Sequence, residues 1–403
     1  MNILVTGANG FIGKHLCLKL TRLGFNVFKY DVDSTKDELV KYIEECDFVV
    51  HLAGINRPLT TQEFYDGNTN FTKELIYLVK EKRGNSLQVI MSSSIQASLD
   101  NDYGKSKKMA EDYLFNSGLP VYVYRLANVF GKWCRPNYNS ACATFCYNIA
   151  HNLDITIRDR EYVVHYNYVE DIVNTFINII NSDYKDGCNS IMYIKPVYDC
   201  SLGRLADLLY YFKSEVESDR HLPIIHDDFE LKLFKTFLDY LTEDGYTYNY
   251  AEDNRGSFEE LYKSKKWGQI SDNISYPGIT KGGHYHTYKK EIFYTVVGKC
   301  LIRQRKVGDN EIISNEVDGN HPQPIDIRVG YTHDITNIGK ENSHTLMWIS
   351  EIYNPESNTS NIEKEETGSA KEPEGCYEVW KMFHLTIKFT TAKIRWHTAN
   401  HSA

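Results

Sequence analysis

The hydrophobic pattern of the chain changes near residue 245, and no other feature constrains the fold as strongly. Before that point, apolar runs such as "DFVVHLAG" and "LQVIMSSS" are separated by amphipathic helix patterns. Such runs are typical of strands buried on both faces, as in a parallel sheet covered by helices on each side. After it, short runs alternate apolar and polar residues between Gly, Pro, Asn and Asp, which indicates an all-β barrel or sandwich. We therefore predict an α/β doubly wound parallel sheet followed by an all-β domain.

A length of 403 residues suits two domains. We expect the first to span 1–245 and the second 250–353, with the boundary inside "TEDGYTYNYAEDNRGS". Helical patterns at 139–152, 168–181, 201–214 and 229–241 predict a smaller, substrate-side lobe of the first domain. Residues 354–403 begin with a polar stretch that predicts a tail disordered at least in part.

Composition excludes several classes of function. A net charge of -9 argues against nucleic-acid binding, because phosphate contacts need a basic face. No apolar run is long enough to span a bilayer, and no signal peptide precedes the first strand. Nine cysteines without a C-x-x-C pair indicate reduced thiols, so we expect a cytoplasmic protein with neither nucleic-acid nor membrane partners.

The stretch "TGANGFIG" places Gly7, Gly10 and Gly13 between the first strand and the first helix. Glycines there let a pyrophosphate approach the amides at the helix N-terminus, which predicts a Rossmann-like nucleotide site. Asp31 ends the second strand, 18 residues after Gly13. A carboxylate at that point binds a ribose 2′-hydroxyl and repels a 2′-phosphate, which favours NAD over NADP. Asp33 could take this role, and either residue could be a turn residue.

Tyr103 and Lys107 stand four positions apart, one turn along a predicted helix. The ammonium of Lys107 is expected to lower the pKa of Tyr103. A tyrosine so tuned can pass a proton to a carbonyl oxygen while hydride arrives from the cofactor. Ser94, chosen among Ser92, Ser93 and Ser94 at the end of a strand, is expected to hold the same oxygen.

The second half contains a pattern of metal-ligating residues: His284, His286, Glu291 and His333. Imidazole nitrogens with one carboxylate suit zinc or another divalent first-row metal. Residues two apart on a strand share a face, so His284 and His286 can act together. A lone His-x-His is more often a surface accident, but the full pattern of G-x5-H-x-H-x4-E-x6-G is much more specific.

Residues 1–245 resemble the extended short-chain dehydrogenase/reductases, through the glycine loop, "HLAG", the serine run, Tyr103, Lys107, "RLANVFG" and "NYVEDIV". The resemblance implies a nucleotide-sugar substrate. It places Asn128, and Asn139 of "PNYNS", near the sugar and UDP, and adds four cofactor contacts: Phe11, Ile12, Leu52 and Ala53. The gap between the serines and Tyr103 is shorter than the family usually has, which implies a trimmed active-site loop. The run Ser94-Ile95-Gln96 stands where 4,6-dehydratases carry Thr-Asp-Glu, which favours a reductase or epimerase.

Residues 250–353 resemble the cupins, whose small β-barrel would take His284, His286, Glu291 and His333 as metal ligands; its second motif departs at Arg328, where proline is usual. "DNRGSFEE" and "GITKGGHYH" also resemble the metal-free 3,5-epimerases of deoxysugar nucleotides. That resemblance makes His284 a general base, and Arg255 and Lys281 substrate contacts, with Lys281 on a phosphate. His284 is thus either ligand or base, in both cases for proton abstraction next to a ketone.

The order of the two halves resembles the bifunctional UDP-2-acetamido-2,6-dideoxy-hexulose reductases of capsule and O-antigen synthesis, which make N-acetyl-L-fucosamine precursors. The resemblance implies that the cupin epimerises C3 of a UDP-4-keto-6-deoxy-HexNAc, and that the first domain then reduces the C4 ketone to a UDP-6-deoxy-talosamine derivative. It also implies a homodimer. The family usually uses NADPH, whereas Asp31 points to NADH, so the expected cofactor is NADPH or NADH. Two alternatives remain: a single-function reductase with a dimerising cupin, and a non-catalytic nucleotide-sensing protein.

Overall fold

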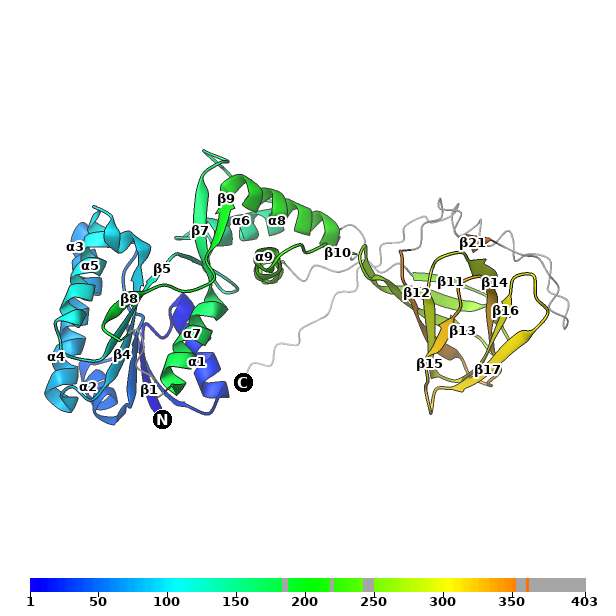
Figure 1. Ribbon diagram of the computed structural model, residues 1–403, viewed down its shortest axis with the longest axis horizontal. Coiled ribbons are helices and arrows are strands. Elements are labelled where there is room, and N and C mark those ends of the chain that lie inside the picture. The colour runs from blue at the N-terminus through cyan, green and yellow to red at the C-terminus, as the bar shows by residue number, and fades with distance from the viewer. Residues whose placement is uncertain (183–187, 218–220, 242–249, 353–359, 362–403) are drawn as a thin grey trace, which may run out of the picture. The chain divides into compact units, whose positions relative to one another are not determined.

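The computed structural model describes residues 1–182, 188–217, 221–241, 250–352 and 360–361 (Figure 1). The chain divides into two compact units. The first comprises Met1–Lys213 with Ile225–Thr242, and the second comprises Ser214–Ile224 with Glu243–Ala403. Among the described helices, none has both the length and the apolar character that a membrane crossing requires.

The first unit alternates strands with helices. Its strands are β1 (Asn2–Thr6), β2 (Asn26–Tyr30), β3 (Phe48–His51), β4 (Gln88–Ser94), β5 (Val121–Leu126), β6 (Asn128–Phe130), β7 (Val163–Tyr168), β8 (Ser190–Met192) and β9 (Tyr198–Ser201). Its helices are α1 (Phe11–Arg22), α2 (Lys36–Glu45), α3 (Thr61–Phe64), α4 (Phe71–Arg83), α5 (Asp102–Phe115), α6 (Ala141–Ala150), α7 (Val169–Asn181), α8 (Leu202–Glu217, whose last turn belongs to the second unit) and α9 (Asp228–Leu238), with a π-helical turn η1 (Tyr65–Asn70) and a 3-10 turn η2 (Ile95–Ser98).

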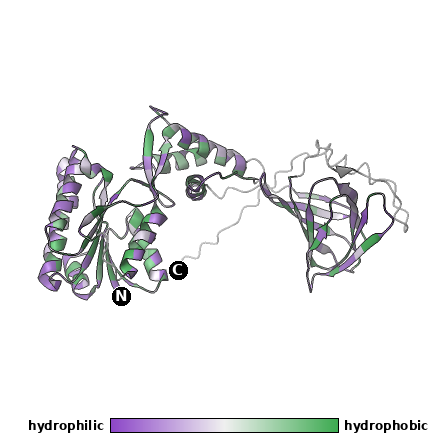
Figure 2. Cartoon of the chain, in the orientation of Figure 1, coloured by the Kyte–Doolittle hydropathy of each residue, from purple (hydrophilic) through white to green (hydrophobic). Residues whose placement is uncertain are grey.

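Six of these strands form one parallel sheet in the order β2-β1-β3-β4-β5-β8. Alternate residues of β1 serve the two faces: Ile3 and Val5 join one buried cluster with α1 and α7, and Leu4 joins another with α2, α4 and α5. Figure 2 shows the strands of this sheet as mainly hydrophobic, between helices that carry their hydrophilic residues outward. The predicted doubly wound parallel sheet is therefore confirmed, and it follows from strands buried on both faces.

The helices of the smaller lobe begin and end close to the predicted positions. α6 begins at Ala141 rather than at 139, because Ser140 is its N-cap and its Oγ accepts a hydrogen bond from the N–H of Ala143 at 3.2 Å. α9 begins after Asp227, whose carboxylate caps Glu230 in the same way. A three-stranded sheet, β6-β7-β9, completes this lobe.

The described part of the second unit consists mainly of strands. These are β10 (His221–Leu222), β11 (Tyr250–Asp253), β12 (Gly256–Ser264), β13 (Gly268–Ser275), β14 (Thr280–His286), β15 (Glu291–Val297), β16 (Lys299–Lys306), β17 (Ile312–Asp318), β18 (Ile325–Ile327), β19 (Tyr331–Asn337), β20 (Ser343–Ile349) and β21 (Ser360–Asn361). They form two sheets, β10-β12-β13-β20-β15-β18 with β11 beside β12, and β17-β16-β19-β14-β21. Apart from the parallel β10–β12 pair, the ladders are antiparallel, which confirms an all-β second half.

The interior of the second unit is only partly apolar. A small cluster of Phe293, Cys300, Ile302, Val317, Ile327 and Ile335 packs side chains from both sheets. The buried face of β13 carries polar side chains: Gln269, Ser271, Asn273 and Ser275. Some of these bond to each other, as Gln269 Nε2 does to Ser271 Oγ at 2.9 Å. A buried polar wall of this kind suits a polar ligand better than a packed core.

Two predictions concern segments that are largely outside the described residues. The expected boundary stretch overlaps 242–249, which is not described. The predicted tail at 354–403 lies outside the described residues except for β21, which pairs with β14. The second unit also includes Ser214–Ile224, which joins it through the pairing of β10 with β12.

Candidate functional site

The glycine loop connects β1 to α1 in the first unit. Gly7 has a φ of +67°, and a Cβ added there would lie 2.7 Å from the backbone nitrogen of Ala53. A Cβ on Gly13 would lie 2.1 Å from the carbonyl oxygen of Gly7, so neither position has room for a side chain. Gly10 is the N-cap of α1, and no side chain caps this helix and no acidic residue lies in its first turn. The loop and the uncapped helix end fit a dinucleotide pyrophosphate.

The other predicted cofactor residues lie at the same edge of the sheet as the glycine loop, after the carboxyl ends of the parallel strands or at the start of α1. Phe11 and Ile12 begin α1, and Leu52 and Ala53 follow β3, where both backbone N–H groups donate to Thr6, at 3.1 and 3.3 Å. Asp31 follows β2, and its Oδ2 accepts the N–H of Asn9 in the glycine loop at 2.7 Å. The Asp31 carboxylate therefore anchors the glycine loop by a hydrogen bond. It also retains lone pairs that can accept a hydrogen bond from a ribose hydroxyl.

The side chain of Ser94 interacts with the hydroxyl of Tyr103 and opposes the rise of its pKa, and Ser94 Oγ also accepts the N–H of Gln96 at 3.2 Å. The neighbouring serines point elsewhere: Ser92 Oγ donates to the carbonyl of His51 at 3.5 Å, and Ser93 Oγ donates to Glu111 at 2.6 Å. Among the three serines, the structure thus brings only Ser94 to the tyrosine. Lys107 is buried on the same helix, and its ammonium donates to the carbonyl of Ser92 at 3.3 Å.

The electrostatics of this pair differ from the prediction. Burial raises the pKa of Tyr103, and only the hydrogen bond with Ser94 opposes that effect. The expectation that Lys107 lowers the pKa of Tyr103 is wrong for this structure, because burial dominates and Lys107 is not among the groups that shift this pKa. Burial also lowers the pKa of Lys107 to about 8, against the attraction of Glu111. Tyr103 is therefore a protonated phenol at neutral pH.

The two predicted sugar-side residues lie on separate elements. Asn128 begins β6, is exposed, and its side-chain amide donates to the carbonyl of His165 at 3.3 Å. Asn139 lies in the loop before α6, where it lines an open cavity. Both positions are solvent-accessible, as a substrate contact requires.

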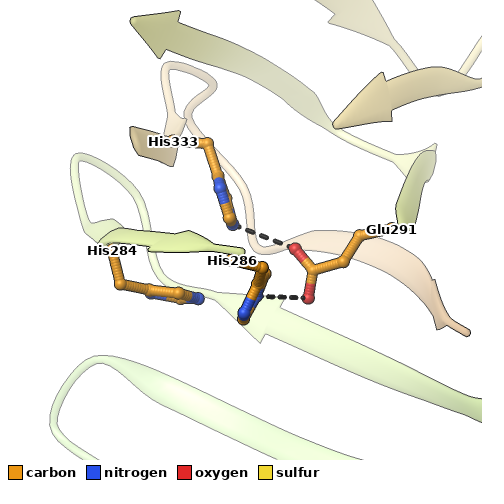
Figure 3. Close-up of side chains that lie close together, drawn as sticks. All are labelled: His284, His286, Glu291 and His333. Carbon is orange, nitrogen blue, oxygen red and sulfur yellow. Dashed lines mark ion pairs between the residues drawn. The ribbon is translucent and has the colours of Figure 1, made fainter. Parts of the chain in front are cut away.

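In the second unit, His284, His286, Glu291 and His333 come together from β14, β15 and β19, with one potential ligand atom of each within 4.8 Å of the others. Figure 3 shows the three imidazoles and the carboxylate converging. A bulge in the β14–β19 ladder between Gly282 and His284 sets His284 opposite His333. Gly282 makes this possible, since its φ is +113° and a Cβ there would lie 2.7 Å from the His333 carbonyl.

The donor set fits a divalent cation. Glu291 Oε2 and His333 Nε2 are 3.0 Å apart, both are buried, and within the described residues neither has a hydrogen-bond partner. The other nitrogen of His333, Nδ1, lies 3.3 Å from the carbonyl of Tyr331, which favours the tautomer with a lone pair on Nε2. Two buried atoms that both carry lone pairs, at this distance from each other, are the arrangement expected of two ligands of one metal ion.

Burial differs among the four donors. His286, Glu291 and His333 are buried, whereas His284 is half-buried. Burial, reinforced by His333, lowers the pKa of His284 to about 3, so the ring is neutral at physiological pH.

The remaining predicted residues, Arg255 and Lys281, lie close to each other around Asp253. Arg255 bonds to Asp253 through Nε at 3.1 Å and Nη2 at 2.8 Å. Lys281 donates to Asn273 Oδ1 at 3.0 Å and to the carbonyl of Ile274 at 2.7 Å, and burial lowers its pKa to about 8. Both positive groups therefore already have protein partners, which a bound phosphate would have to share or displace.

Comparison with known proteins gives matches to both halves. Residues 3–193 match the NAD dependent epimerase/dehydratase family, and residues 251–360 match the polysaccharide biosynthesis C-terminal domain. The UDP-2-acetamido-2,6-beta-L-arabino-hexul-4-ose reductase of Pseudomonas aeruginosa is 37% identical over 88% of this chain and 96% of its own. The chain belongs to this reductase family.

The solved structures agree with this assignment. The capsular polysaccharide assembling protein CapF from Staphylococcus aureus is 40% identical, with a TM-score of 0.80 over 90% of this chain and 99% of its own. A UDP-glucuronic acid 4-epimerase from Bacillus cereus, in complex with NAD, is 18% identical, with a TM-score of 0.51 over 60% of this chain and 98% of its own. That second likeness shows the fold alone. The recognised family is therefore confirmed, and this hexulose reductase family member is an enzyme.

Sequence reasoning missed a buried ionic network behind the reductase site. Glu111 is fully buried and accepts two hydrogen bonds from Arg125, Nε to Oε1 at 2.9 Å and Nη2 to Oε2 at 2.7 Å. Ser93 Oγ donates to the same carboxylate. Glu111 stands four residues after Lys107, on the helix face that is buried, and Arg125, which opens "RLANVFG", is the one charged residue in its apolar strand. A glutamate on a buried helix face and an arginine within a buried strand were the signals in the sequence for this pair. The network joins β4, β5 and α5, and thereby fixes the strand end that carries Ser94.

We expect Arg125→Met to destabilise the first unit by about 3–5 kcal/mol, because the Glu111 carboxylate is left buried without its partner. The Glu111→Gln/Arg125→Met double variant should lose much less. Helical circular dichroism during guanidinium denaturation measures this, since the described helices belong mainly to the first unit. Arg160→Met is the matched control, because the Arg160–Asp207 pair is exposed and its loss should have little effect on stability. Equal losses for both single variants would contradict the prediction.

Proposed function

We propose that this enzyme is bifunctional and acts twice on one UDP-4-keto-6-deoxy-HexNAc. Residues 250–353, a cupin domain, epimerise C3, and residues 1–245 reduce the C4 ketone with NADPH or NADH to a UDP-6-deoxy-talosamine type product for surface polysaccharide synthesis. The Pseudomonas relative, named as a reductase of a hexul-4-ose, supports this substrate class. The observation that carries the proposal is the Ser94–Tyr103 pair in a chain that also gathers three histidines and a glutamate within 4.8 Å.

In the reductase step, the bound nicotinamide would supply the hydride. Tyr103 gives its hydroxyl proton to the C4 oxygen, which the raised pKa permits because the phenol is protonated at neutral pH. Ser94 donates a hydrogen bond to the same oxygen and orients it against Tyr103. Lys107, one helical turn after Tyr103, fixes the end of β4 through its hydrogen bond to the carbonyl of Ser92.

The remaining residues of the first unit bind and orient. We assign the cofactor to Gly7, Gly10, Phe11, Ile12, Gly13, Asp31, Leu52 and Ala53, with Tyr103 and Lys107. The substrate then contacts Asn128 and Asn139. The close packing of the glycine loop and the bond from Asn9 to Asp31 support the cofactor assignment.

In the epimerase step, the ketone at C4 acidifies the C3 proton. A divalent ion, with zinc the first choice for this donor set, would be held by His286, Glu291 and His333 and would supply positive charge for the enolate oxygen. His284 is the half-buried member, so it suits either a fourth ligand or the base that removes the C3 proton. We assign Arg255 and Lys281 to substrate binding at the edge of this site.

Two alternatives remain distinguishable. A single-function reductase with a dimerising cupin would reduce the ketone without exchanging the C3 proton. A nucleotide-sensing protein would bind UDP-sugars without turnover, and the retained Tyr103 and Lys107 count against it. We further propose a cytoplasmic homodimer, as the resemblance to the family implies.

We expect Tyr103→Phe to lower nicotinamide turnover by about 10²–10⁴-fold, because the proton donor is lost. Exchange of the C3 proton in heavy water should persist in this variant. Both are followed on a UDP-4-keto-6-deoxy-HexNAc, with product stereochemistry by NMR. Tyr113→Phe, on the same helix but exposed, is the control. Loss of exchange together with turnover would refute the two-site proposal.

We expect Glu291→Gln to reduce both the metal content of the purified protein and C3 exchange, while NADPH binding stays unchanged. His284→Asn separates the two roles of His284. A base would leave the metal in place and abolish exchange, whereas a ligand would lose both. Metal content is measured by mass spectrometry of the digested protein. A fully active enzyme without metal would overturn the ligand assignment.

We expect the wild-type enzyme to use both NADH and NADPH, with a weaker preference for NADPH than its family usually shows. Asp31→Asn should shift the ratio of the two kcat/KM values towards NADPH by about tenfold, or ~1.4 kcal/mol. The asparagine keeps an oxygen for the N–H of Asn9 but removes the charge that repels a 2′-phosphate. Asp33→Asn is the control. A strong NADPH preference in the wild type would contradict the role given to Asp31.

A further inference from the structure

A small cavity of about 130 Å³ lies in the first unit, with residues of the parallel sheet and of the sheet β6-β7-β9 in its walls. Its apolar lining comes from η2, the connection between β5 and β6, and the loop between β8 and β9. These apolar residues are Ile95, Ala127, Ile194 and Val197. Ile194 is fully buried, whereas Val197 is exposed, so the cavity has an inner wall and an open rim. None of the four was a predicted site residue.

The cavity adjoins two residues of the proposed reductase site. Ile95 follows Ser94 directly, and Ala127 precedes Asn128 directly. The side-chain amide of Asn128 donates to the carbonyl of His165 at 3.3 Å, and His165 also lines the cavity. A sugar that contacts both Ser94 and Asn128 would therefore lie next to this cavity.

The polar side chains of the lining mostly have protein partners. Arg125 donates to both carboxylate oxygens of Glu111, at 2.9 and 2.7 Å, and the side chain of Tyr193 also interacts with its guanidinium. Asn167 donates to two backbone carbonyls, at 3.3 and 3.2 Å, and its Oδ1 accepts the N–H of Ala127 at 2.9 Å. A ligand group inside the cavity would therefore meet mainly apolar surface.

His165 differs from these residues because its side chain is 56% exposed and lies at the rim. Its Nδ1 is 2.6 Å from Oδ1 of Asp199. A polar group of a ligand could be recognised by His165 at the rim but not by the inner wall. His165 is therefore the residue on which a competing explanation of the cavity would depend.

We propose that this cavity receives the C6 methyl group of the 6-deoxy sugar and selects it over a C6 hydroxyl. The inference rests on the proposed function, which brings the C4 oxygen to Ser94 and Tyr103. Of the two ring carbons bonded to C4, C3 carries a hydroxyl and C5 carries the methyl, and an apolar wall suits the methyl. An apolar cavity of about 150 Å³ can hold a molecule of the size of benzene, so the space is ample. A hydroxyl placed there would lose its water and find few partners, which disfavours binding.

The test compares two stable nucleotide sugars that differ only at C6, UDP-GlcNAc and UDP-6-deoxy-GlcNAc, by calorimetric titration of the full-length protein. The wild type should bind the 6-deoxy sugar about tenfold more tightly, because a buried hydroxyl without a partner is unfavourable. Ile95→Asn should bring the ratio of the two Kd values to about one, since the amide offers the hydroxyl a partner. Val197→Asn should lower the ratio about threefold, through lost apolar contact.

The matched control is Ile191→Asn. Ile191 lies on β8, is 36% exposed and does not line the cavity, so this variant should keep the wild-type ratio. A ratio of two Kd values is the informative readout, because a general loss of stability weakens the binding of both sugars alike. Should Ile95→Asn not fold, by circular dichroism, Ile95→Ala replaces it and should lower the ratio about threefold.

Three outcomes would overturn the proposal. The first is equal binding of the two sugars by the wild type, or a preference for the 6-deoxy sugar that survives the changes at both Ile95 and Val197. The second is tighter binding of UDP-GlcNAc that is lost in His165→Ala, which would assign the cavity to a hydroxyl. The third concerns UDP-glucose, which lacks the acetamido group. If Ile95→Asn loses discrimination between UDP-glucose and UDP-GlcNAc and keeps the 6-deoxy ratio, the cavity holds the acetamido group instead.

Failure of this proposal is separable from failure of the proposed function, because neither probe requires turnover. A protein that selects the 6-deoxy sugar through Ile95 and Val197 but does not reduce the keto-sugar would refute the function and leave the methyl site. An active reductase with an unchanged Kd ratio and an unchanged KM for the keto-sugar in Val197→Asn would refute the methyl site and leave the function. The methyl site requires KM to rise in Val197→Asn while kcat is largely retained, because Val197 is not among the proposed catalytic residues.

Discussion

The parallel pairing of β1, β3, β4 and β5 is the constraint on which the first unit depends. These strands are buried on both faces, so they need helical crossovers, and their carboxyl ends all meet at one edge of the sheet. The glycine loop, Leu52, Ser94 and Asn128 each follow or end one of those strands. A sheet held together by burial therefore also places the glycine loop, Leu52, Ser94 and Asn128 at one edge.

The second unit differs from the first in that it buries a group of ionisable side chains. Three histidines and a glutamate occupy one region between two antiparallel sheets, and a bulge at Gly282 is needed to turn His284 towards His333. Buried nitrogen and oxygen atoms that carry lone pairs are unfavourable when too few protons are available to hydrogen-bond them. A bound cation would remove that cost. The polar inner face of β13 belongs to the same pattern, because a unit that encloses a polar reactant gives up part of its apolar core.

Much of this was predictable from the sequence, and the exceptions have a common cause. Hydrophobic period identified the sheet types, and spacing identified Tyr103 with Lys107 and His284 with His286, since strand and helix geometry convert spacing into proximity. The Glu111–Arg125 pair and the Asn9–Asp31 bond each join two different elements, and spacing along the chain does not show which side chains of two elements meet. The sign of the Tyr103 pKa shift was missed for the same reason, because burial and the direction in which Lys107 points are set by packing.

Two activities in one chain make chemical sense if a single ketone serves both. The C4 carbonyl makes the C3 proton removable, and the same carbonyl accepts hydride. Reduction of the ketone removes the acidity of the C3 proton, so epimerisation has to come first. The reductase must then either discriminate between the two C3 epimers or act after they have equilibrated. Under the proposed function, joining the units would raise the local concentration of the epimerised ketone near the reductase. Selectivity between the epimers would have to arise at the sugar itself, next to the proposed catalytic residues Ser94 and Tyr103.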